Sequence, residues 1–238
     1  MSRTQNLGLP LIAPSQAQKH VTVNEALVRI DAVSQLAVEA SDGVAPPGEA
    51  LEGRAYLVSG DPIGDWSGQG GKVAVKSNGG WVFIEPQAGW SAWDKGRSQL
   101  LQYDGSEWIG DAVAISPGGA ATRHQVLEID HAIGLGATSV ATGAIPANSL
   151  VLGVTGRVLE AIEGPGVYTW RLGVAGSENR YGSGLGSAAG SFVHGLTSSP
   201  LAYYSDTDLV FSAEQGSFSG GTVRLSLHVV VLGLPRAA

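Results

Sequence analysis

Four acidic residues in the second half of this 238-residue sequence could do chemistry as a pair. They are Glu160, Glu163, Asp206 and Asp208. Hydrolysis of a glycosidic bond uses two carboxylates that flank the bond, and a fold can bring such a pair together from distant positions. The run Asp206-Thr207-Asp208 is also typical of a turn entering a strand, where carboxylates cap backbone amides. Polysaccharide cleavage therefore stays open as an alternative, although no spacing in the sequence demonstrates it.

Other patterns that could carry chemistry are incomplete. The Gly-rich run at 182–186 resembles a dinucleotide-binding fingerprint only superficially, because it lacks the preceding strand and the following helix. No serine is flanked as G-x-S-x-G, and the sequence contains no cysteine. The five histidines have no spacing typical of a zinc site; they are His20, His124, His131, His194 and His228. We therefore expect no catalytic residue, metal or cofactor, and predict that the protein is not an enzyme.

Tryptophans among small polar neighbours are stronger candidates, and they point to binding. Trp66 lies in a Gly-Asp-Trp-Ser-Gly run, and Trp90 and Trp93 lie three residues apart in a similar setting. If these rings face outward, they could stack on sugars or pack against another subunit. They could equally form the core of a small Gly-rich β domain, as we expect of Trp81 and Trp108.

The second half of the sequence offers further candidates for binding a glycan. Residues 173–190 begin with Gly173 and contain five further glycines, which predicts a long loop. Compact domains rarely keep so long a loop without a functional role. Tyr203 and Tyr204 are neighbours in a predicted strand, so one ring should point inward and the other outward. The predicted glycan contacts are Trp66, Trp90, Trp93, Asn179, Arg180, Tyr181, His194, Tyr204 and Asp206.

Composition limits the class of protein that must position these residues. The hydrophobic content of 43% favours a folded chain, and no apolar stretch approaches the eighteen residues of a membrane span. The net charge is −7, without any cluster of Lys or Arg. A nucleic-acid partner and membrane insertion are therefore not expected.

The N-terminal residues 1–36 predict an extended segment followed by one helix. Leucines alternate with Gly8 and Pro10, which interrupt a helix. The run Thr22-Val23-Asn24-Glu25 has the form of a capping box and predicts a helix over residues 23–36, with a short turn before it at 15–19. A single apolar stripe follows, and it comprises Val23, Ala26, Leu27, Ile30 and Val33.

The remainder predicts two β modules, so the chain should be mainly β. Residues 37–115 hold short strands of a Trp-rich β-meander, with hairpin turns before Trp81 and Trp108. All lysines lie before residue 96, and residues 116–123 read as a linker. Residues 124–238 show seven or eight strand-like runs, which predict an antiparallel β-sandwich of the jelly-roll kind.

Several segments carry a family resemblance. Residues 4–22, TQNLGLPLIAPSQAQKHVT, and 24–27, NEAL, resemble the opening signature of a domain family of formerly unknown function from alphaproteobacterial prophages and gene-transfer-agent clusters. The runs GGWVF at 79–83 and GWSAW at 89–93 also match its style. Parts of the second half, such as FSGGTVR at 218–224, are similar to β-sandwich tails attached to that domain.

The resemblance implies a structural protein of a phage-like particle, of the head-spike or fibre kind. Such a protein is assembled in the bacterial cytoplasm, released with the particle, and binds capsular polysaccharide from the particle surface. Its partners would be other particle proteins, in a homo- or hetero-oligomer, and the family defines no catalytic residues. The residues expected to serve attachment or oligomerisation are Leu7, Leu9, Leu11, Ile12, His20, Leu27 and Ile30. A spike base or adaptor that contacts only proteins is the alternative.

Overall fold

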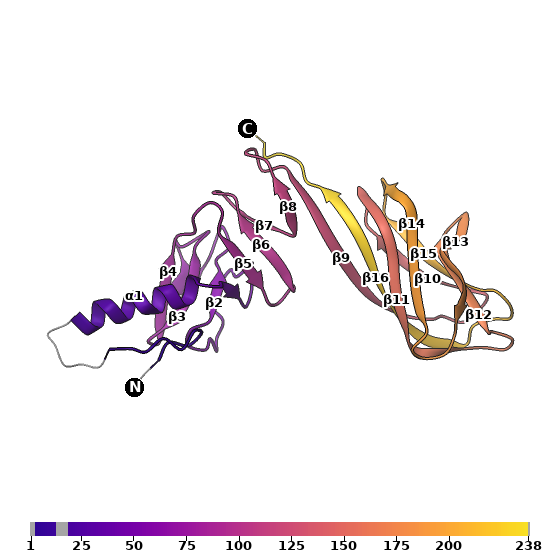
Figure 1. Ribbon diagram of the computed structural model, residues 1–238, viewed down its shortest axis with the longest axis horizontal. Coiled ribbons are helices and arrows are strands. Elements are labelled where there is room, and N and C mark those ends of the chain that lie inside the picture. The colour runs from indigo at the N-terminus through magenta and orange to yellow at the C-terminus, as the bar shows by residue number, and fades with distance from the viewer. Residues whose placement is uncertain (1–2, 13–18, 238) are drawn as a thin grey trace. The chain divides into compact units, whose positions relative to one another are not determined.

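The computed structural model describes residues 3–12 and 19–237, which form two compact units divided between Ala112 and Val113 (Figure 1). The fold is mainly β with one helix, which confirms the predicted class. The elements of the first unit are α1 (Lys19–Val33), β1 (Ala37–Val38), β2 (Ala55–Leu57), the short 3-10 helix η1 (Gly64–Trp66), β3 (Val73–Ser77), β4 (Gly80–Ile84), β5 (Ser91–Asp94), β6 (Gln99–Tyr103) and β7 (Trp108–Gly110).

A single mixed sheet forms the first unit, in the order β4-β3-β2-β1-β5-β6-β7. The two-residue strand β1 pairs in parallel with both β2 and β5, and the other pairs are antiparallel. The unit therefore contains two three-stranded meanders joined through β1, instead of the one meander predicted.

Both predicted hairpin turns are present. Asn78 and Gly79 have φ of 52° and 76°, the left-handed values that the tight turn between β3 and β4 requires. Between β6 and β7, the Asp104 carboxylate accepts hydrogen bonds from the amides of Ser106 and Glu107, at 2.8 and 3.0 Å. The two predicted turns thus close one hairpin in each meander.

The helix differs from the prediction in its ends. Because α1 begins at Lys19, Thr22 and Glu25 lie inside it, so the capping box is wrong; residues 15–18 of the predicted preceding turn lie outside the described part. Among the described side chains of the helix, Asp31 and Ala32 are buried, whereas Val23 and Ile30 of the apolar stripe are 40% and 50% exposed. The helix packs through its other face, because Asp31 there receives hydrogen bonds from the N-terminal segment.

This N-terminal segment is not simply extended. Arg3 pairs with Pro10 in an isolated antiparallel bridge, and the amide of Thr4 donates to the Leu9 carbonyl over 3.0 Å. Gly8, with φ of 66°, provides the left-handed residue of the bend. The prediction missed that residues 3–10 fold back on themselves.

The second unit contains an antiparallel β-sandwich, as predicted. Its strands are β8 (Ala112–Ile115), which begins at the division between the units, β9 (Ala121–Ala132), β10 (Thr138–Ile145), β11 (Ser149–Glu163), β12 (Thr169–Val174), β13 (Ser177–Gly186), β14 (Phe192–Tyr203), β15 (Thr207–Ala213) and β16 (Gly220–Leu232). One sheet has the order β10-β15-β12-β13 and the other β14-β11-β16-β9-β8 (Figure 1).

Strand pairing in the sandwich is nested. In sequence order, the first strand of the sandwich proper, β9, pairs with the last, β16. Moving inward along the sequence, β10 pairs with β15, β11 with β14, and β12 with its direct successor β13. Nested antiparallel pairing across two sheets of β9 to β16 is jelly-roll topology. Between the sheets lies an apolar core that includes Trp170, Leu172, Phe211, Leu225 and Leu227.

Two segments that were predicted to be irregular contain parts of regular strands. Residues 116–120 form a tight turn in which the Ser116 hydroxyl accepts from the Ala120 amide, and β9 already begins at Ala121, so the linker prediction 116–123 is wrong in its second half. The predicted loop at 173–190 contains β13, paired with β12. Gly173 is required there because a Cβ on it would meet the Ser177 carbonyl oxygen at 2.1 Å. Close approach of two strands explains this glycine.

Candidate functional site

Tyr203 and Tyr204 at the end of β14 point to opposite sides, as their adjacency predicts. The side chain of Tyr203 lies in the core with 8% exposure, and Tyr204 is 84% exposed. Because successive residues of a strand face opposite ways, burial of the first ring places the second in solvent. Tyr204 is therefore an aromatic surface available to a ligand.

A hollow of about 630 Å³ lies beside this ring. It forms where the first residues of β11 meet the last residues of β14 and β16, since Ser149 is aligned with both Tyr203 and Val231. Its lining consists of Asn148, Ser149, Leu150, Ala202, Tyr203, Tyr204, Leu232 and Leu234. The size falls in the range of small-molecule binding sites.

Below the hollow, a buried hydrogen-bond network fixes Tyr203. Its hydroxyl lies 2.7 Å from that of Tyr181 and accepts a hydrogen bond from Nη1 of Arg180 at 3.1 Å. Burial, together with the hydrogen bond to Tyr203, raises the pKa of Tyr181 far above its ordinary value, so Tyr181 stays protonated. Tyr181 is 1% exposed, so the prediction that it contacts a glycan is wrong; its ring is part of the core.

The polar rim of the hollow is positioned by Asp206. Its carboxylate accepts a hydrogen bond from the Ala147 amide at 2.8 Å, and the Ser149 hydroxyl donates to the Pro146 carbonyl at 2.7 Å. Asn148, between these two bonds, is exposed and has a left-handed φ of 58°. Asp206 thus holds the turn that places Asn148 at the rim.

The other predicted glycan contacts in the second unit do not line this hollow. Asn179 is exposed on β13, and His194 is exposed on β14 opposite Thr155 of β11. Arg180 contributes through its bond to Tyr203. Of the predicted set, the structure therefore brings together Arg180, Tyr181, Tyr204 and Asp206, with Tyr204 as the direct surface contact.

The three predicted tryptophans belong to the first unit. Trp66 is fully buried and packs edge-on against Trp81, with ring centroids 5.1 Å apart, so its predicted glycan contact is wrong. The apolar cluster with Val58 and Ala74 holds the ring inside because the small unit has few other large side chains to fill its core. Trp90 is half-buried, and Trp93 on β5 is 45% exposed.

Three of the four carboxylates that could have formed a hydrolytic pair have structural partners. Glu160 accepts from the Thr222 hydroxyl at 2.6 Å, and Asp208 accepts from the Gly143 amide at 2.7 Å, as Asp206 does from Ala147. In the described part of the chain, no group of three or more His, Asp or Glu side chains is arranged to hold a metal ion.

Sequence reasoning missed most of the lining of the hollow. Leu150, Leu232 and Leu234 lie in apolar runs typical of core strands, so the sequence did not mark them as surface residues. The last two are nevertheless 64% and 87% exposed. The Pro146-Ala147-Asn148 sequence has turn composition and could have marked the rim. What the sequence does not show is that the starts and ends of three distant strands meet.

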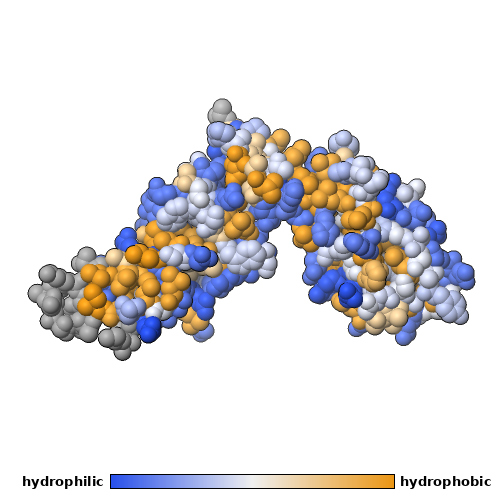
Figure 2. All heavy atoms as spheres, viewed as in Figure 1, coloured by the Kyte–Doolittle hydropathy of each residue, from blue (hydrophilic) through white to orange (hydrophobic). Residues whose placement is uncertain are grey.

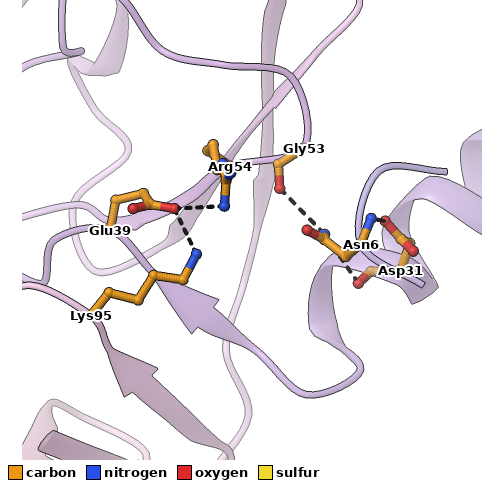
Figure 3. Close-up of polar contacts among 6 residues, drawn as sticks. All are labelled: Asn6, Asp31, Glu39, Gly53, Arg54 and Lys95. Carbon is orange, nitrogen blue, oxygen red and sulfur yellow. Dashed lines mark hydrogen bonds and ion pairs between the residues drawn. The ribbon is translucent and has the colours of Figure 1, made fainter. Parts of the chain in front are cut away.

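The first unit holds the predicted attachment region, and Asp31 organises it (Figure 3). The buried Asp31 carboxylate accepts hydrogen bonds from the Thr4 hydroxyl at 2.7 Å and from the amides of Leu7 and Asn6 at 2.6 and 2.9 Å. Burial raises the pKa of Asp31, but these hydrogen bonds together outweigh it and hold the pKa below its ordinary value. The bend at residues 4–9 is therefore clamped to the helix.

Two more polar contacts support this region. The Asn6 side-chain amide reaches the Gly53 carbonyl at 3.3 Å (Figure 3), and the Asn24 side chain bonds both the amide and the carbonyl of Ile12, at 2.9 and 3.1 Å. Nearby, Glu39 pairs with Arg54 at 3.2 Å and Lys95 at 2.8 Å (Figure 3). The segment up to residue 12 thus lies along α1.

Hydrophobic side chains remain on the surface of this region, and Figure 2 shows them gathered over α1. Leu7 and Ile12 are each 48% exposed and Ile30 is 50% exposed, whereas Leu9, Leu11 and Leu27 are half-buried. The side chain of His20 lies outside the described part. No helix among residues 3–12 and 19–237 is long and apolar enough to cross a membrane.

Comparisons with known proteins give one family match. Residues 23–109, which span most of the first unit, match the model of a family described as "Protein of unknown function (DUF2793)". This confirms a resemblance to a domain family of unknown function over residues 23–109. The gene-transfer-agent family and the head-spike or fibre type stay predictions. No curated protein matches the chain.

Among solved structures, the chain is weakly similar to one described as "Cyanophage Pam1 capsid asymmetric unit". The similarity has 18% sequence identity and a TM-score of 0.30, and it covers 47% of this chain and 84% of that chain.

Proposed function

We propose that this chain is a structural spike or fibre protein of a phage-like particle, of the gene-transfer-agent kind, that binds capsular polysaccharide on the recipient cell without cleaving it. The N-terminal region of the first unit attaches the chain to the particle, and the second unit carries the glycan site. The observation that carries the proposal is the exposed ring of Tyr204 beside the hollow of about 630 Å³.

This hollow has the chemistry that a sugar ring requires. A sugar presents a face of C–H groups, which packs on an aromatic ring such as Tyr204, and hydroxyls, which need polar partners such as Asn148. Leu150 and Leu232 extend the apolar surface. The Tyr181 and Arg180 contacts to Tyr203 hold the floor in place, so little order has to be gained on binding.

Binding without cleavage is supported by the hydrogen bonds of three of the four candidate carboxylates. Glu160, Asp206 and Asp208 each hold part of the chain's own backbone or a neighbouring hydroxyl. Purified protein incubated with capsular polysaccharide should therefore release no new reducing ends. Their appearance at a rate proportional to protein concentration would instead identify a depolymerase.

A purely structural adaptor is the second candidate, and the apolar lining of the hollow favours it. Leu150, Leu232 and Leu234 could seat a side chain of another particle protein. The two functions separate in a retention experiment in which full-length protein is applied to immobilised capsular polysaccharide of recipient cells. Retention, and inhibition of particle adsorption by the free protein, support glycan binding; failure of both leaves the adaptor.

A further inference from the structure

The turn between β3 and β4 contains the one Asn-Gly pair of the sequence, Asn78-Gly79. Because Ser77 is aligned with Gly80, these two residues form the whole turn, and both are exposed. Their φ values of 52° and 76° are left-handed. An asparagine that precedes glycine is chemically labile, because no Cβ on the glycine hinders the approach of its backbone nitrogen to the asparagine side chain.

The Glu52 carboxylate holds both amides of this turn. One of its oxygens accepts a hydrogen bond from the Asn78 amide and the other accepts one from the Gly79 amide, each at 2.8 Å. The backbone places Glu52 there, because the amide of the next residue, Gly53, donates to the Lys76 carbonyl at 2.8 Å. The Lys76 ammonium donates to the Gly79 carbonyl at 2.9 Å. Gly79 is thus fixed through both its amide and its carbonyl.

We infer that Asn78 is a site of deamidation and that the Glu52 carboxylate restrains the reaction. In this reaction the Gly79 nitrogen attacks Cγ of Asn78, and the bond from Cγ to the side-chain nitrogen breaks. That nitrogen leaves as ammonia and takes the proton of the Gly79 amide. Water then opens the cyclic imide at either carbonyl, which leaves aspartate or isoaspartate at position 78. Nothing is oxidised or reduced, and water is the only co-reactant.

Glu52 opposes the first step in two ways. The attack requires the Gly79 amide to lose its proton, and a carboxylate that accepts this proton's hydrogen bond at 2.8 Å disfavours a second negative charge on the nitrogen. The two hydrogen bonds also hold the peptide unit in one orientation, and rotation of that unit during ring closure breaks them. Removal of the carboxylate should therefore accelerate deamidation.

The modified residue would lie in the predicted attachment region. Asn78 lines a hollow of about 450 Å³ together with Leu11, Asn24 and Val28, which belong to the N-terminal segment and α1. Either product places a negative charge beside Glu52 where a neutral amide stood, and isoaspartate also lengthens the backbone of the turn. Deamidation would thus loosen the hairpin where it borders α1. The reaction requires neither a particle nor a polysaccharide, so the inference is independent of the proposed function.

Peptide mapping of the full chain by mass spectrometry, after incubation at mildly alkaline pH, tests the inference. Glu52→Gln should deamidate at Asn78 about two- to tenfold faster than the wild type, which is the factor that corresponds to one net hydrogen bond. Glu49→Gln is the matched control, because Glu49 is an exposed acid three residues away, and it should react like the wild type. The other asparagines precede residues larger than glycine and should react far more slowly.

Hydrogen exchange shows that the variant has lost only the hydrogen bonds to Glu52. The amides of Asn78 and Gly79 should exchange faster in Glu52→Gln, while the amides of β3 keep their wild-type protection. Faster deamidation with both of these exchange results supports the inference. Equal deamidation rates in the two proteins, a slower rate in Glu52→Gln, no reaction at Asn78 in either protein, or unchanged exchange of the Gly79 amide would overturn it.

Discussion

The phenolic oxygens of Tyr181 and Tyr203 lie 2.7 Å apart and join the edge strand β13 of one sheet to the edge strand β14 of the other. Near this bond the two strands approach so closely that a Cβ on Gly195 would meet the Tyr181 carbonyl oxygen at 2.1 Å. The pair closes one side of the sandwich directly beneath the hollow. The position of Tyr204 at the surface therefore depends on a contact in the core.

Replacing Tyr203 by phenylalanine should destabilise the protein. The substitution leaves the buried Tyr181 hydroxyl without its partner and removes the acceptor of Arg180, which should lower the free energy of unfolding by about 1–3 kcal/mol. Urea denaturation measures this change. Tyr204→Phe removes an exposed hydroxyl and should change stability by less than about 0.5 kcal/mol; equal effects of the two variants would refute the role of the buried pair.

Asp31 should determine the order of the N-terminal bend. Asp31→Ala leaves the amides of Asn6 and Leu7 without their acceptor, so we expect fast hydrogen exchange at residues 4–9 and a loss of about 1–3 kcal/mol. Asp61→Ala, at an exposed position of the same unit, is the control. Unchanged exchange of the Leu7 amide in Asp31→Ala would show that other contacts hold the bend.

The same carboxylate predicts a pH dependence. Because the hydrogen bonds hold the pKa of Asp31 below its unfolded value, their stabilisation is fully present above the unfolded pKa of about 3.9 and is lost as the pH falls through the lower folded pKa. Protection of the bend should therefore persist at neutral pH and fall below about pH 4. In Asp31→Asn this step should be absent; a step of equal size in the variant would assign it to another group.

Truncation of Trp66 should destabilise the protein far more than truncation of Trp93. Trp66→Ala empties the centre of a buried cluster and should cost about 3–5 kcal/mol, whereas Trp93→Ala removes a ring that is 45% exposed and should cost about 1 kcal/mol or less. Thermal unfolding monitored by fluorescence distinguishes the two. A small effect of Trp66→Ala would contradict its place in the core.

Local chemistry explains which parts of this fold were predictable from the sequence. Strand alternation correctly separates Tyr203 from Tyr204, and the Asn78-Gly79 turn predicts its hairpin because left-handed φ values favour those residues. Strand spacing in the second half likewise predicts the sandwich.

Sequence patterns failed to predict the features that depend on contacts between residues far apart in the sequence. The apolar stripe of α1 resembles a core face, but the helix packs through Asp31, whose partners Thr4 and Leu7 lie more than twenty residues away. The glycine-rich composition of residues 173–190 is typical of a loop, but Gly173 is needed for the close approach of β12 and β13. The hollow beside Tyr204 combines β11, β14 and β16, and no local pattern reveals that meeting.

The most direct test of the proposed function is the affinity of the full chain for capsular polysaccharide with and without the Tyr204 ring. Tyr204→Ala should weaken binding by about two- to tenfold, since one aromatic stacking contact is worth about 0.5–1.5 kcal/mol beyond the area it buries. Tyr168→Ala is the matched control, because Tyr168 is 75% exposed in the same unit but does not line the hollow. The proposal predicts wild-type affinity for Tyr168→Ala and this loss for Tyr204→Ala, measured by calorimetric titration. Equal affinities of the two variants, or no binding by the wild type, would contradict it.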